Sequence, residues 1–331
     1  MSRRLDVIIA WGLVVAIVFS GLAHGAVEAW SVAGLQLLLI LLVELWALRM
    51  VAQRRFRIVI PGATVPLLGL IIYGAIQGLS WTGSDGRRSS LSFDVDLTRG
   101  TVFMLILFTG AFLIAANFWT SRTRLRVFAW FLTIFGFALS VFALIQGFTW
   151  NERFYWVRPI ADLMAPYGPF PSHNNYAGYL ELFVPVAVAM ALTRALPNPA
   201  RMFCAFAAAI MSLSIVFSLS RGGMISLAGG LLFLAAASIG TARYRRRAWE
   251  AEFGPEDGPD GEFDEDYDDD LPRWRRAPFP QVAMVVVILS AIIAGMLWLG
   301  PDKIASRLTQ GTLTGNNIAG QNFYASRGWI W

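Results

Sequence analysis

The residues best suited to chemistry lie in the stretch Ser218 to Gly223 (SLSRGG), where Arg221 interrupts an apolar run from Met202 to Gly240. An ion at membrane depth is costly unless it lies at the interface or faces a functional cavity. A guanidinium group is permanently charged and can bind two phosphate oxygens at once. With the free amides of a tight turn at Gly222 and Gly223, Arg221 would suit a diphosphate at head-group level. The alternative is that Arg221 only extends its side chain to the interface.

A second candidate stretch runs from Gly168 to Leu182 (GPFPSHNNYAGYLEL), where Gly and Pro residues predict an irregular backbone before a helix begins. His173, Asn174 and Asn175 fall at the start of that helix. We expect His173 and the amide side chains to line a wet groove that binds hydroxyl-rich or phosphate groups near the positive helix end. The alternative is that Asn174 or Asn175 only caps the helix.

Two further charged residues could complete such a site. Glu181 lies one to two turns into the same predicted helix, and a carboxylate within a membrane span is a functional candidate unless an arginine such as Arg221 pairs with it. Arg327, near the end of the sequence, would be a second cation for the same anion if its segment folds back over the membrane.

Other kinds of site are not expected. Two histidines and one cysteine make a zinc site unexpected, and there is no phosphate-binding glycine loop. Asp94 and Asp96 have a spacing that could hold a divalent cation, but such pairs are common by chance, and we expect no metal. Cys204 is expected to be a small buried apolar residue. The other polar residues of the apolar runs are expected to bond between helices: His24, Glu28, Glu44, Gln77 and Gln146.

The elements that must position these residues are membrane helices. Hydrophobic residues make up 56% of the 331 residues and charged residues only 15%, far from the composition of a soluble domain. The long apolar runs do not alternate as barrel strands would, so we predict an all-α polytopic membrane protein. Nine runs are long enough to span a membrane: 6–23, 31–51, 62–80, 99–120, 127–150, 175–194, 202–220, 222–240 and 281–299.

The arginines predict how these spans are oriented. Most of the 27 basic residues fall at alternate span ends, which places the N-terminus in the cytoplasm by the positive-inside rule. Arg221, the loops 81–98 and 151–174 and residue 331 then face outward, which in a bacterium is the periplasm. Because the basic residues are explained by this orientation, the net charge of +5 does not indicate a nucleic-acid partner.

The chain is therefore expected to have four parts: eight spans in residues 1–240, a loop, a ninth span at 281–299, and an outward segment at 300–331. The loop, 241–280, holds more than half of the 22 acidic residues and few large apolar groups, which predicts a disordered cytoplasmic linker or an acidic partner-binding segment. Because the outward segment stops after Trp-Ile-Trp, we expect it to be the truncated beginning of a larger periplasmic loop.

Several motifs together are similar to those of a known family. GPFPSHNNYAGYLEL, followed by SLSRGG and then by SRGWIW after a long outward segment, resembles the O-antigen ligase and O-antigen polymerase superfamily of bacterial inner-membrane glycosyltransferases. The similarity extends back to LSFDVDLTRG and the following SRTRLR turn, and so covers most of the chain from about residue 90 onward.

The resemblance implies a helical glycosyltransferase of the GT-C type. Such an enzyme takes a glycan from undecaprenyl diphosphate at the periplasmic face and transfers it to a hydroxyl of the lipid A core or of another glycan repeat. It implies that Arg221 and Arg327 hold the diphosphate, that no metal or other cofactor is needed, and that the general-base histidine lies beyond Trp331. The sequence alone would then carry leaving-group binding without its base, and we expect it to be inactive by itself.

Two other classes of protein compete with this hypothesis. In a transporter or lipid-binding membrane protein, Arg221 would bind an anionic solute, and a transporter should show paired broken spans in related halves. In a scaffold of an envelope-polysaccharide complex, the acidic loop would bind a partner.

Overall fold

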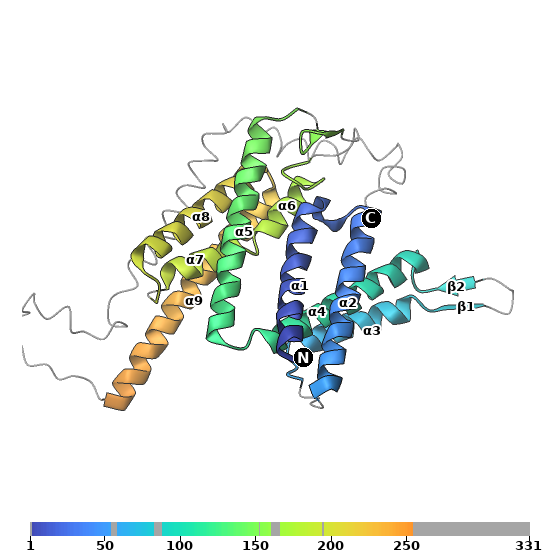
Figure 1. Cartoon of the computed structure of the whole chain (residues 1–331), viewed down its shortest axis with the longest axis horizontal. Coiled ribbons are helices and arrows are strands. Elements are labelled where there is room, and N and C mark those ends of the chain that lie inside the picture. Colours follow the sequence, from blue (N-terminus) through green and yellow to red (C-terminus); the bar gives the residue numbers. More distant parts are fainter. Residues whose placement is uncertain are drawn as a thin grey trace, which may run out of the picture. The chain divides into compact units, whose positions relative to one another are not determined.

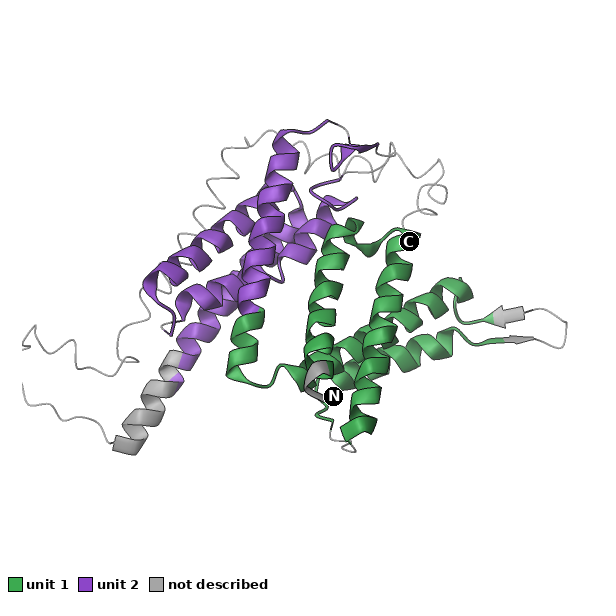
Figure 2. Ribbon diagram, in the orientation of Figure 1, with its two compact units in different colours: residues 1–128, 330–331 green, residues 129–329 purple. Residues whose placement is uncertain are grey.

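The computed structural model describes residues 2–53, 58–82, 88–151, 153–159, 166–193 and 195–253, which are almost entirely helical (Figure 1). The described residues form two compact units (Figure 2). Unit 1 runs to Phe128 and unit 2 begins at Ala129. The predicted ninth span, the loop from residue 254 onward and Arg327 lie outside the described residues.

Unit 1 is a set of apolar helices packed through leucine-rich stripes. In α1 the buried residues Ile9, Leu13 and Ala16 recur at helical spacing, and Leu35, Leu39 and Leu42 do the same in α2. Leu107 and Ile114 of α4 pack in the same cluster. The elements of unit 1 are α1 (Ser2–Leu22), the 3-10 helix η1 (His24–Ala26), α2 (Ala29–Gln53), α3 (Thr64–Gln77), the antiparallel strands β1 (Ser80–Thr82) and β2 (Arg88–Ser90), α4 (Val95–Phe118) and the start of α5 (Arg122–Phe148).

Unit 2 contains the rest of α5 and four further helices. Figure 1 shows α7 and α8 packed side by side, with only five residues between them in the sequence. Gly136 of α5 allows a close approach, because a Cβ there would lie 2.6 Å from Met211 Sδ of α8. After α5 come the paired strands β3 (Arg153–Phe154) and β4 (Arg158–Pro159), then α6 (His173–Leu180), α7 (Val184–Leu192), α8 (Asn198–Phe217) and α9 (Arg221–Phe253).

Seven helical segments are long and apolar enough to cross a membrane, which makes the protein a multi-pass, all-α membrane protein. They are Leu5–Leu22, Ala29–Gln53, Val95–Phe118, Arg122–Phe148, His173–Leu192, Asn198–Phe217 and Arg221–Thr241. These correspond to seven of the eight spans predicted before residue 240. The exception is the predicted span 62–80, where α3 has 14 residues and a length of about 21 Å, short of the ~30 Å hydrocarbon core. It ends at Gly78, and β1 then begins at Ser80.

The first part of the segment predicted as a disordered loop is helical. Helix α9 continues without interruption to Phe253, so residues 241–253 are helical. Their alanines, arginines and glutamates are strong helix formers, and the Gly254-Pro255 pair follows at once.

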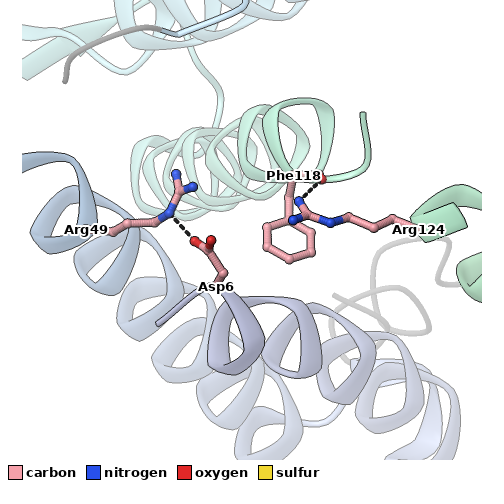
Figure 3. A network of polar contacts seen from close by, with 4 residues as sticks. All are labelled: Asp6, Arg49, Phe118 and Arg124. Atoms are coloured by element: carbon pink, nitrogen blue, oxygen red, sulfur yellow. Dashed lines mark hydrogen bonds and ion pairs between the residues drawn. The ribbon is translucent and has the colours of Figure 1, made fainter. Parts of the chain in front are cut away.

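Two arginines near helix ends of unit 1, Arg49 and Arg124, make polar contacts in the same part of that unit (Figure 3). Arg49, near the end of α2, forms an ion pair with Asp6 at the start of α1. Arg124 of α5 donates to the backbone oxygen of Phe118 at the end of α4 (3.0 Å) and lies over the Phe118 ring, 4.7 Å from its centre. The side of the membrane that these helix ends face stays a prediction.

Candidate functional site

The candidate site lies where α6 and α9 of unit 2 pack against each other. Three contacts join the helices in the same sequence order. Ser220 Oγ donates to Asn174 Oδ1 (2.8 Å), a Cβ placed on Gly223 would lie 2.5 Å from the Cβ of Ala177, and Ser226 Oγ donates to Glu181 Oε2 (2.5 Å). Because the numbering rises together along both helices, α6 and α9 run parallel. Their N-terminal ends therefore lie at the same end of the pair.

The reversal before Arg221 is built differently from the prediction. The chain turns at Ser218 to Ser220, where Leu219 has a positive φ of 56°. Ser218 stabilises the turn, since its hydroxyl donates to the backbone oxygen of Ile215 (2.6 Å). The Gly222–Gly223 pair lies within the first turn of α9, so the prediction that it forms the reversal was wrong. Gly223 serves instead for the close contact with α6.

Ser220 caps the start of α9. Its buried hydroxyl accepts from the amide of Gly223 (3.2 Å), and its carbonyl oxygen accepts from the amide of Met224 (3.0 Å). The amides of Arg221 and Gly222 have no acceptor among the described residues. No atom lies within 4 Å of the position that a Cβ of Gly222 would take, and the Arg221 side chain is exposed. Two free backbone amides thus lie next to an exposed guanidinium group at the start of α9.

The start of α6 presents a similar group of amides. Ser172 holds the N-cap position, and its carbonyl oxygen accepts from the amide of Tyr176 (3.1 Å). Asn174 and Asn175 lie inside the first turn, so the alternative that one of them caps the helix was wrong. Their backbone amides have no acceptor in the described part of the chain. His173, the first residue of α6, is half-buried at the same end.

A buried polar network supports this end of unit 2. Tyr176 of α6, which is fully buried, shares a 2.6 Å hydrogen bond with Ser214 of α8. The ring of Tyr167, in the loop before α6, packs against that of Tyr176 with 4.9 Å between centres. Burial raises the pKa of Tyr167 to about 12, so its phenol stays protonated near neutral pH. Sequence reasoning missed the bond between Tyr176 and Ser214, because the two residues are 38 positions apart in the chain.

Gln146 ties the loop to the end of α5. With both ends of its buried amide satisfied, the nitrogen donates to Gly168 O (2.9 Å) and the oxygen accepts from Tyr155 N (2.9 Å). The prediction that Gln146 bonds between helices was therefore wrong, since both partners are loop backbone groups. Gly168 has a φ of 56°, and a Cβ there would lie 2.7 Å from that of Ala143, so the loop packs tightly onto α5.

Glu181 lies at a break between α6 and α7. Pro185 has no amide hydrogen for the carbonyl oxygen of residue 181, and the amides of Leu182 and Phe183 bond three residues back, to Tyr179 (3.3 Å) and Leu180 (3.0 Å). The carboxylate is partly exposed and accepts from Ser226. Among the described residues no ion pair joins Glu181 to Arg221, so the pairing considered as an alternative is not formed.

The described residues contain no group of three His, Cys, Asp or Glu side chains that could hold a metal ion. Asp94 caps α4 by accepting from the amide of Leu97 (3.0 Å). Cys204 is buried, as predicted.

The structure thus brings Asn174, Glu181 and Arg221 to one helix pair, with His173 at its N-terminal end. Comparison with protein-family models, with curated proteins and with solved structures found no match for this chain. A function therefore rests on the geometry of the α6–α9 pair and on the resemblance of the motifs.

Proposed function

We propose that this protein is a lipid-linked glycan ligase or polymerase of the bacterial inner membrane. It would take a glycan from undecaprenyl diphosphate at the periplasmic face and transfer it to a hydroxyl of the lipid A core or of another glycan repeat. The observation that supports it best is the parallel α6–α9 pair, whose two N-terminal ends meet beside the exposed Arg221. The motif resemblance supplies the substrate class.

The charges at this end suit a diphosphate. Each helix N-terminus carries roughly half a positive charge, and the amides of Arg221, Gly222, Asn174 and Asn175 are free to donate. The guanidinium group of Arg221 adds a full charge and can bind two oxygens of one phosphate. Because the donors are held in place by helix packing, little reorganisation is needed when an anion binds.

In the proposed reaction, the acceptor oxygen forms a bond to the anomeric carbon of the glycan, and the bond from that carbon to the diphosphate oxygen breaks. The electron pair leaves with the diphosphate, whose growing charge Arg221 and the helix amides stabilise. The hydroxyl proton passes to a general-base histidine, which the resemblance predicts and which the described residues do not assign. No cofactor is proposed, and Arg327 as a second diphosphate ligand stays a prediction.

The other predicted site residues have supporting roles in this proposal. His173 and Asn174 would contact the head group from α6. Glu181 would hold α9 in place through Ser226, about 10 Å further along the helix pair than the Ser220–Asn174 contact.

The test is glycan transfer by purified full-length protein in lipid, with undecaprenyl-diphosphate-linked glycan as the donor. We expect Arg221→Ala to lower kcat/KM by roughly 10²- to 10³-fold, the usual cost of removing one preorganised charge-stabilising donor. Arg221→Lys should retain only part of the wild-type kcat/KM, because an ammonium group cannot bind two phosphate oxygens in the bidentate geometry of a guanidinium group.

Arg122→Ala is the matched control, since Arg122 is also an exposed first residue of a helix but lies in unit 1. The Arg122→Ala variant should transfer glycan at the wild-type rate. The wild-type protein should do the same in the presence of a chelator. Full transfer by both Arg221 variants would refute the diphosphate role, and loss of transfer on chelation would refute the metal-free mechanism.

A further inference from the structure

The hydroxyl of Ser220 has a fixed hydrogen-bonding pattern, because the residue is only 1% exposed. Its oxygen accepts from the amide of Gly223, and its single hydrogen must find an acceptor inside the protein. That acceptor is the side-chain oxygen of Asn174 at 2.8 Å. The reverse orientation, with the Asn174 nitrogen toward Ser220, would leave the buried hydroxyl hydrogen without an acceptor at a substantial cost in free energy.

The orientation of Asn174 follows from this pattern. Its oxygen faces Ser220, so its NH₂ group is turned away from the helix contact. Asn174 is exposed, and its NH₂ group donates to no other residue in the described part of the chain. Because Ser220 directly precedes Arg221, this donor lies beside the free amides of Arg221 and Gly222.

We infer that Asn174 is a direct ligand of the bound anion, donating from its NH₂ group, and that Ser220 is a positioning residue that holds this group in place. The inference rests on the proposed diphosphate site and assigns one of its contacts. It also explains why an amide, rather than a carboxylate, stands at this position. Aspartate could accept from Ser220 equally well, but it would present a negative oxygen to the anion.

The test compares binding of undecaprenyl diphosphate to purified full-length protein and three variants, together with thermal unfolding. Asn174→Asp keeps an acceptor for Ser220 and favours the start of α6, so its unfolding temperature should stay near that of the wild type. Its affinity should fall roughly tenfold to a hundredfold, because a hydrogen bond to a charged group is replaced by repulsion.

Two asparagine variants carry the same change of charge at other helix starts. Asn175→Asp lies one residue further along α6 and does not face Ser220, so it should weaken binding much less than Asn174→Asp. Asn198→Asp lies at the start of α8, where its oxygen accepts from Arg201 (3.4 Å) as Asn174 accepts from Ser220, and it should bind normally.

Two variants of Ser220 test its positioning role, with thermal unfolding recorded for each because Ser220 also caps α9. Ser220→Ala should weaken binding, and Ser220→Thr should restore it, since threonine keeps the hydroxyl. Equal weakening by Asn174→Asp and Asn175→Asp would overturn the role of Asn174 while leaving the diphosphate site intact. Failure of the wild type to bind undecaprenyl diphosphate would instead overturn the proposed function.

Discussion

Unit 1 and unit 2 both consist of apolar helices, but they use polar side chains in different places. In unit 1 the polar contacts lie at helix ends: Asp6 pairs with Arg49, and Asn117 bonds both backbone groups of Val59 (2.7 and 2.9 Å). In unit 2 fully buried side chains also bond between helices, as Ser214 of α8 joins Tyr176 of α6. Bonds between helices fix relative positions, which is what a binding site requires.

The two units also differ in what the glycines at their helix contacts meet. Leucine and isoleucine side chains fill the core of unit 1, and a Cβ on Gly12 or Gly110 there would meet only the outer side-chain atoms of Leu42 or Val43. In unit 2, Gly223 meets Ala177 directly, and Gly136 meets Met211 and Phe183. Small residues bring the backbones of membrane helices together, so polar groups on adjacent helices come within hydrogen-bond distance. We therefore regard unit 1 as a scaffold. Unit 2 holds side chains of adjacent helices in the fixed positions that a binding site needs.

The strongest test of this difference is an added methyl group. In Gly223→Ala the new Cβ would lie 2.5 Å from the Cβ of Ala177, which is fixed to the backbone, so α6 and α9 must separate. We expect a loss of about 1–3 kcal/mol in the free energy of unfolding, the usual cost of overpacking. Denaturant unfolding of the purified protein measures it.

Gly110→Ala in unit 1 is the matched control. Its Cβ would lie 2.9 Å from Cγ2 of Val43, a side-chain methyl that can rotate away. The better helix propensity of alanine, up to about 1 kcal/mol, should offset the remaining crowding. Equal destabilisation by the two variants would remove the distinction between the units.

A smaller effect is expected when one hydrogen bond between helices of unit 2 is removed. Tyr176→Phe deletes the hydroxyl that pairs with Ser214 in a fully buried position, and it should cost about 1–2 kcal/mol in the free energy of unfolding. Adding Ser214→Ala should recover part of the loss, because no buried hydroxyl is then left without its partner. Strictly additive losses in the double variant would argue against this bond.

The parts predicted well from the sequence are those set by local composition. Apolar length predicts seven helices, because the cost of exposing polar groups to lipid leaves few other structures. It fails at α3, where Gly78 and a following strand end the helix early, and at residue 241, where strong helix formers continue α9. Apolar content alone does not determine where a helix ends.

The candidate site was predicted in its residue types but not in its contacts. Arg221 and Asn174 attract attention because charges and amides are rare within apolar runs. The bonds from Ser220 to Asn174 and from Ser226 to Glu181 join residues 46 and 45 positions apart, and a serine within an apolar run is unremarkable in itself. Which serine meets which partner depends on the parallel packing of α6 and α9, which a single sequence does not reveal.

The smallest effect is expected at the ion pair of unit 1. Asp6 and Arg49 are 21% and 26% exposed, so water and salt screen their attraction, and Asp6→Asn should cost only about 0.2–1 kcal/mol in the free energy of unfolding. The loss should shrink at high salt, and Arg49→Gln should add little to it in the double variant. Because the pair lies in the scaffold unit, affinity for undecaprenyl diphosphate should stay unchanged in Asp6→Asn. A loss of affinity in that variant, with the fold intact, would show that unit 1 takes part in binding and that the division into scaffold and site is wrong.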